Sequence, residues 1–152
     1  MPEIDFAFLA DAADARPGQK FNVLGGGVTR IGGPAFPLVH PHLALVIGLT
    51  VASSELGRDH ELQFLLLGPS GSELSRAEAQ IRADGWAAGG GDTSVTFALD
   101  LWNLTFAEPG DYSLRVLIGG SERKRMILTL ERSTGAPGSG VVPPFPPTTG
   151  RA

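Results

Sequence analysis

The sequence predicts an all-β fold, an antiparallel β-sandwich of about seven to nine strands that is immunoglobulin-like or jelly-roll-like. Three observations favour this class. The 152-residue chain carries 21 glycines and 12 prolines, which divide it into segments of the length of short strands. Apolar residues recur with a period of two inside these segments, and strong helix signals are scarce. A chain of this length can bury a core without disulfides or metals, so we expect one domain.

The first third of the chain is predicted to form a hairpin followed by a central strand. Residues 4–11 show period-two alternation, and Arg16-Pro-Gly-Gln19 places Pro and Gly where a type II turn needs them. We expect residues 20–31 to return as one strand. Residues 43–51 are almost continuously apolar and rich in β-branched side chains, which is typical of a strand with neighbours on both sides.

The middle of the chain is predicted to form a second pair of strands. Residues 60–67 and 73–83 flank the turn Gly68-Pro-Ser-Gly71. The second segment contains good helix formers, so a short helix stays open as the alternative. Because Gly71 and Gly85 bracket it closely, we predict a strand.

The last third is predicted to contain three strands, over residues 95–102, 112–118 and 126–130. Gly119-Gly120-Ser121 connects the last two as a hairpin, and we expect the first to pair with the strands that follow it. Pro109-Gly-Asp-Tyr112 precedes an alternating segment. In immunoglobulin-like sandwiches a tyrosine at such a position often anchors a corner through its hydroxyl group.

The composition changes at the C-terminus, so we predict a sandwich domain over residues 1–132 and a tail over residues 133–152. The tail carries one charge and no period-two pattern, which indicates disorder or polyproline II structure. Its proline cluster has the extended backbone that proline-binding grooves select. The candidate interface residues in this cluster are Pro143, Pro144, Phe145 and Pro146.

The composition also excludes several classes of function. The chain has no cysteine, so disulfides, thiolate zinc sites and a cysteine nucleophile are absent. A net charge of −4 gives no long-range attraction to nucleic acid or to an anionic membrane. The N-terminal segment is acidic where a secretory signal is basic, and no apolar run is long enough to span a membrane. We therefore expect a cytoplasmic protein without nucleic-acid or membrane partners.

Asn22 to Pro34 contain five glycines but no phosphate-binding motif. A dinucleotide fingerprint starting at Gly25 would need glycine where Arg30 stands, and Gly33 occupies the lysine position of a phosphate loop. We predict a glycine-rich strand or bulge opposite residues 8–10, with the Phe8 ring covering one glycine. The alternative is a groove left open for a partner. The candidate interface residues of that groove are Gly25, Gly26, Gly27 and Arg30.

Three histidines offer one possible metal site. His40 and His42 would project to one side of an extended segment, and His60 could join them from the start of another strand. The competing interpretation is that they are ordinary loop histidines. Gly68-Pro-Ser-Gly-Ser72 lacks the second glycine of a serine-hydrolase elbow. We therefore assign no catalytic residue and no cofactor.

The chain resembles a family of small, mostly actinobacterial, β-rich proteins catalogued only as a domain of unknown function. The resemblance is most specific at Phe8-Leu-Ala-Asp-Ala-Ala13 and Lys20-Phe-Asn-Val-Leu-Gly-Gly-Gly-Val-Thr-Arg-Ile31. It continues at Pro37, residues 43–51, Gly57-Arg-Asp-His-Glu-Leu62, Gly68-Pro-Ser-Gly71 and Pro109-Gly-Asp-Tyr-Ser-Leu114. It covers about residues 4–131 and implies a stand-alone β-rich domain, with no activity to transfer.

Three functional hypotheses follow. The first is a non-enzymatic binding or assembly module that contacts a protein partner through loops, an edge strand or the tail. The second is a small metal-dependent enzyme or metal-binding protein using His40, His42 and His60. The third is a self-assembling structural subunit, that is, a homo-oligomer.

Overall fold

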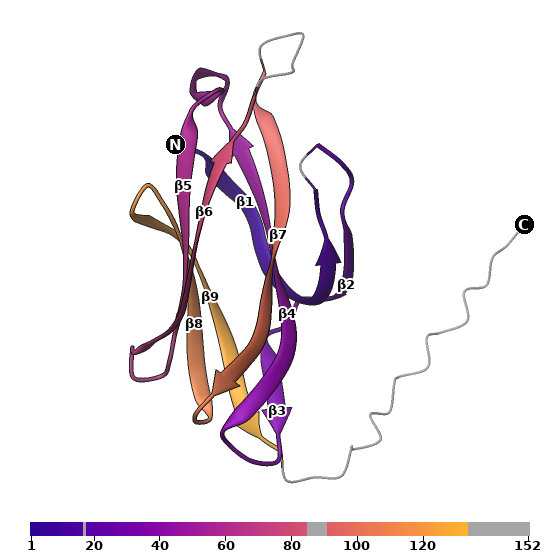
Figure 1. Ribbon diagram of the computed structural model, residues 1–152, viewed down its shortest axis with the longest axis vertical. Coiled ribbons are helices and arrows are strands. Elements are labelled where there is room, and N and C mark those ends of the chain that lie inside the picture. The colour runs from indigo at the N-terminus through magenta and orange to yellow at the C-terminus, as the bar shows by residue number, and fades with distance from the viewer. Residues whose placement is uncertain (17, 85–90, 134–152) are drawn as a thin grey trace, which may run out of the picture.

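The structure, a computed structural model, describes residues 1–16, 18–84 and 91–133, and within these ranges the chain forms nine β-strands and one short 3-10 turn (Figure 1). The elements are β1 (Glu3–Asp14), β2 (Asn22–Gly26), β3 (Arg30–Gly33), β4 (Leu38–Val51), η1 (Ser53–Glu55), β5 (Asp59–Leu67), β6 (Glu73–Arg82), β7 (Thr93–Phe106), β8 (Gly110–Ile118) and β9 (Ser121–Arg132). The all-β prediction is confirmed, and β6 is a strand as predicted. Apart from Ser133, the predicted C-terminal tail, with its proline cluster, lies outside the described residues.

The strands form two sheets. The four-stranded sheet has the order β2-β1-β4-β7, and the five-stranded sheet has the order β3-β9-β8-β5-β6. Strand β4 lies between β1 and β7, which confirms the central strand predicted over residues 43–51. All pairings are antiparallel except that of β3 with β9, which is parallel. The sandwich prediction is therefore correct, with one parallel ladder added.

The prediction of a single strand over residues 20–31 is wrong. Strand β2 pairs with β1 in the first sheet, whereas β3 pairs with β9 in the second. Gly25 and Gly27 have φ of +60° and +85°, values that glycine adopts readily and other residues rarely do. The N–H groups of Gly27 and Val28 both donate to the Leu9 carbonyl, at 2.8 and 2.9 Å, where the chain leaves the first sheet.

The predicted pairing of residues 95–102 with the strands that follow is also wrong. Strand β7 pairs along its whole length with β4, and the chain then crosses to the other sheet, where β8 and β9 form the predicted hairpin. The two-residue loop of that hairpin, Gly119-Gly120, has φ of +56° and +80°, as a type I′ turn requires. Alternation within a strand identifies its two faces but not its neighbours.

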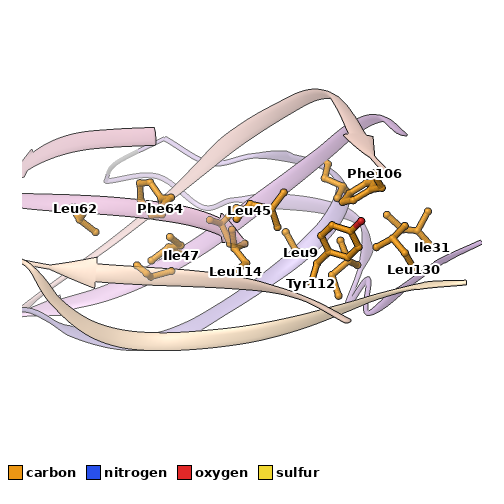
Figure 2. Close-up of a cluster of buried hydrophobic side chains, with 14 of the residues drawn as sticks. Leu9, Ile31, Leu45, Ile47, Leu62, Phe64, Phe106, Tyr112, Leu114 and Leu130 are labelled. Atoms are coloured by element: carbon orange, nitrogen blue, oxygen red, sulfur yellow. The ribbon is translucent and has the colours of Figure 1, made fainter. Parts of the chain in front are cut away.

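The core lies between the two sheets and is built from the inward-facing residues of both (Figure 2). Leu45 and Ile47 of β4 face Leu62, Phe64 and Leu114 of the other sheet, and all five are at most 4% exposed. This burial is the main source of the free energy that holds the two layers together.

Tyr112 closes one end of this core. Its ring is 1% exposed and lies edge-on to Phe106 at 5.0 Å, and its hydroxyl group donates to the Glu108 carbonyl at 2.7 Å. The predicted tyrosine corner is confirmed. It fixes the crossing from β7 to β8, and thus the place where β7 ends.

Candidate functional site

Side chains of the same chain fill the space above Gly25 and Gly26, two of the three consecutive glycines. Gly26 pairs with Ala10, one residue away from the predicted register. A Cβ atom on Gly26 would lie 3.6 Å from the Phe8 ring, so the predicted cover by Phe8 is confirmed at this glycine. On Gly25 it would collide with the Asp11 carboxylate. A Cβ atom on Gly27 would have no described atom within 4 Å other than those of Gly27 and its two chain neighbours.

Gly27 borders a small cavity between the two sheets. The cavity has a volume of about 290 Å³ and is lined by Ala7 to Leu9, Gly27 to Thr29 and Lys124 to Ile127. Arg30 does not line it. Its guanidinium group forms an exposed ion pair with Glu131 at 2.6 Å, across the β3–β9 ladder. Of the four residues predicted to form a groove, only Gly27 borders this cavity. The role of the cavity as an interface stays a prediction.

The structure does not bring the three histidines together. His40 and His42 belong to strand β4, so the interpretation of them as loop residues is wrong. His60 is the second residue of β5, in the other sheet. Strand β5 follows the far end of β4, and the part of β4 that runs from His42 to that end is about 30 Å long. Among the described residues, no three His, Asp or Glu side chains gather closely enough to hold a metal ion.

His42 instead links three strands of the four-stranded sheet. Its Nδ1 lies 2.7 Å from the Asp11 carbonyl oxygen on β1, and its Nε2 lies 2.7 Å from Asp100 Oδ1 on β7. The Trp102 ring contacts the imidazole, with the ring centroids 4.2 Å apart and the ring planes tilted by 40°. The His42 side chain is 18% exposed, so the ring is held in one position by its neighbours.

The partners of His42 favour its charged form. A carbonyl oxygen and a carboxylate oxygen are both acceptors, so both ring nitrogens must carry hydrogen for the two bonds to form. The hydrogen bond to Asp100 raises the pKa of His42; burial lowers this pKa, while the Asp11 carbonyl and the charge of Asp100 raise it further. The imidazolium in turn neutralises the carboxylate of Asp100.

Sequence reasoning missed this cluster. Asp100 and Trp102 are two residues apart in an alternating strand, so a common face could have been predicted from the sequence. Their contact with His42 depends on the pairing of β4 with β7, where His42 lies opposite Trp102. That pairing has no local signal.

The outer edge of β7 is the most unusual surface of the described fold. Among the residues that the structure describes, no strand pairs with the outer edge of β7. The strand is 14 residues long, contains neither Gly nor Pro, and carries one charged side chain, that of Asp100. Natural proteins protect such edges by shortness, charges, prolines or bulges, because an open edge templates pairing with another strand.

The other three edge strands of the described sheets are protected. Strands β2 and β3 have five and four residues. Strand β6 is ten residues long but contains four charged side chains, those of Glu73, Arg76, Glu78 and Arg82. By contrast, the single charged side chain of β7, that of Asp100, is hydrogen-bonded to His42. One irregularity interrupts β7, Asn103, whose φ is +50°.

A cleft runs beside β7 on its inner side, between β7 and β6. One part of it, of about 790 Å³, is lined by Val95 and Phe97 of β7 and by Ile81 of β6, among others. Further along, Leu101 and Leu104 of β7 face Ala77 of β6 across a narrower gap. The inner side chains of β7 are only partly buried, so apolar surface is accessible along this cleft.

The outer face of the four-stranded sheet is apolar beside this edge. Phe6 stacks against Phe8 and Phe21, with ring centroids 6.0 and 5.8 Å apart, and covers the middle of the sheet. Trp102 remains 65% exposed at the β7 border of this face. An open backbone edge and an exposed aromatic ring therefore lie on the same strand.

These features define the protein as an all-β sandwich with nine described strands in two sheets. Within the described residues, no helix is long and apolar enough to cross a bilayer. The chain belongs to DUF6941, a family of unknown function, which it matches over residues 5–131. No curated protein matches the chain in sequence.

Several solved structures are similar in fold. The C-terminal domain of wzt has a TM-score of 0.47 at 10% identity, over 90% of this chain and 77% of that one. An immunoglobulin-like protein from Pseudomonas aeruginosa has a TM-score of 0.44 at 14% identity, over 86% and 96% of the two chains. The Pseudomonas fluorescens alkylpurine DNA glycosylase AlkC, solved bound to DNA containing an abasic site analogue, has a TM-score of 0.46 at 10% identity over 86% of this chain. This chain spans only 30% of that glycosylase, and likenesses at this level concern the fold alone.

Proposed function

We propose that the protein is a non-enzymatic, cytoplasmic binding module that binds an extended protein segment by strand addition along the outer edge of β7. The observation that carries the proposal is the absence of edge protection on this one long strand. Its composition, with Asp100 as its single charge, contrasts with the four charges of β6. In strand addition, main-chain hydrogen bonds supply affinity, and pockets for alternate side chains supply specificity.

The surroundings of β7 offer contacts to side chains on both faces of an added strand. Side chains of an added strand that point inward would meet Val95, Phe97 and Leu101, which line the cleft next to β6. Side chains that point outward would lie beside Trp102. Exposed tryptophan is enriched among residues that dominate binding energy, because it buries a large apolar area.

A photo-crosslinking experiment tests strand addition at β7. Benzoylphenylalanine is placed at exposed Ser94 of β7, and the full chain is irradiated in native lysate. We expect a crosslinked protein that disappears when Ala98→Lys is added, since a charge on the edge opposes pairing. The matched control, Gln80→Lys, adds the same charge to exposed β6 and should leave the crosslink unchanged.

Two further measurements complete the test. Both lysine variants are melted, so that loss of the crosslink is compared only between folded proteins. The crosslink is also repeated with a chain ending at Ser133, which keeps all nine described strands and separates the edge from the tail. A crosslink that survives Ala98→Lys, or no crosslink at all, would contradict strand addition at β7.

A further inference from the structure

We infer that the strand added to β7 is β7 of a second copy of this chain, related by a twofold axis that passes beside Ala98. The inference rests on the proposed use of the β7 edge and names its occupant. The two four-stranded sheets would join edge to edge into one eight-stranded antiparallel sheet. An antiparallel edge can form a twofold-symmetric interface with itself. If residue i of one copy contacts residue j of the other, then residue j of the first copy also contacts residue i of the second.

The geometry of β7 selects the register. In an antiparallel ladder, opposite residues share a face, so the two residue numbers of each pair must sum to an even number. The regular part of β7 begins at Thr93 and ends at Asn103, whose positive φ interrupts the strand. The longest ladder between these limits pairs Thr93 with Asn103 and therefore places Ala98 opposite Ala98 of the second copy.

This register also matches the side chains. Asp100 lies opposite Thr96 of the second copy, which offers a hydroxyl donor, rather than opposite a second Asp100. Like charges that face each other directly across a ladder are destabilising. On the inner face, Phe97 meets Leu99 of the second copy, which gives an apolar pair.

Charge and hydrogen-bond number are compatible with a stable dimer. The carboxylate of Asp100, the one charged group of β7, is hydrogen-bonded to His42, so the edge carries no unpaired charge. Eleven paired residues supply about ten main-chain hydrogen bonds, the number found in an ordinary protein interface. A strand of a different protein would need side chains that match those of β7 along the whole ladder, whereas a second copy of β7 pairs with the first in the symmetric register described above.

The cysteine-free chain allows a direct test of the register. Opposite Cα atoms in an antiparallel ladder lie about 4.5–5.5 Å apart, within disulfide range. After oxidation, we expect the full-length Ala98→Cys variant to form a covalent dimer. The control, Thr96→Cys, should stay monomeric on a denaturing gel, because two copies of residue 96 would be about 13 Å apart.

Charge substitutions at residue 96 give an independent readout in solution. Sedimentation should show the unmodified protein at twice the 15.9 kDa chain mass. Thr96→Glu faces Asp100 of the second copy and should raise the dissociation constant at least tenfold, whereas Thr96→Lys faces the same carboxylate and should leave it unchanged or lower it. Melting curves verify that the variants are folded.

The outcomes separate this inference from the proposed function. Both the dimer and strand addition are supported if Ala98→Cys forms the disulfide and if Thr96→Glu weakens the dimer while Thr96→Lys does not. A monomer that still gives an edge-dependent crosslink to a different protein overturns the second copy and leaves strand addition standing. A monomer without such a crosslink overturns both, and a dimer insensitive to residues 96 and 98 places the interface elsewhere and overturns this inference.

Discussion

Replacing His42 by Phe should reveal how much the histidine stabilises the four-stranded sheet. The phenyl ring keeps the contact with Trp102 but has no N–H groups, so the acceptors on Asp11 and Asp100 lose their protein donor. The bond to the Asp11 carbonyl is worth about 1 kcal/mol, as is typical of a protein hydrogen bond. The Asp100 side chain is 52% exposed, and solvent screening reduces its share to less than about 1 kcal/mol.

The expected loss is therefore about 1–2 kcal/mol in the free energy of unfolding, measured by urea denaturation at pH 6. In a protein of this size each kcal/mol lowers the melting temperature by about 2–4 °C. The stabilisation should depend on pH with a defined sign. Because Asp100 raises the pKa of His42 in the folded state, the contribution is complete below the ordinary value of 6.5 and is lost as the pH rises through the folded-state pKa.

The difference between the unmodified protein and His42→Phe should thus shrink from pH 6 to pH 9. Asp100→Asn is the matched control, since it keeps an acceptor oxygen but removes the charge, and it should lower the pKa of His42. An NMR titration of the ring proton that disappears in His42→Phe reports this pKa directly. A value at or below 6.5, or an equal stability difference at both pH values, would refute the assignment of an imidazolium.

Two other substitutions test the packing on either side of the sheet. Tyr112→Phe removes the hydroxyl donor of the Glu108 carbonyl while keeping the buried ring, and should cost about 1 kcal/mol in urea denaturation; a loss below about 0.3 kcal/mol would mean that the corner bond contributes little. Gly48→Ala would drive a Cβ atom into the Phe6 ring and should cost about 1–3 kcal/mol, with a smaller cost in a Phe6→Leu background; equal costs in both backgrounds would contradict the contact.

Features encoded by neighbouring residues could be predicted from the sequence. The β8–β9 hairpin follows from two glycines between alternating segments, and both have the positive φ that the turn needs. The corner at Tyr112 follows from its short local motif, since donor and acceptor are four residues apart. The cover of Gly26 by Phe8 follows from the hairpin between them, even though the register is shifted by one residue.

Features that depend on distant partners could not be predicted. The segment from Lys20 to Ile31 has the alternation of one strand, but β3 leaves the first sheet because β9, about 100 residues later, offers it an edge. The His42 site joins residues from three strands, and its closest sequence separation, 31 residues to Asp11, exceeds any local motif. The three histidines left a metal site open as an alternative, whereas the structure gives His42 two oxygen acceptors.

The same distinction explains why β7 is informative only once its neighbours are known. A 14-residue strand with one charge is what a central strand looks like in sequence, and β4, which is central, has no Asp, Glu, Lys or Arg at all. Placed at an edge, that composition is anomalous, because an edge open to solvent favours charges such as those of β6. Selection for solubility alone would remove the anomaly with a single lysine at an exposed position such as Ser94. A composition typical of a central strand, found on an edge strand, supports the proposal that another strand pairs with the outer side of β7.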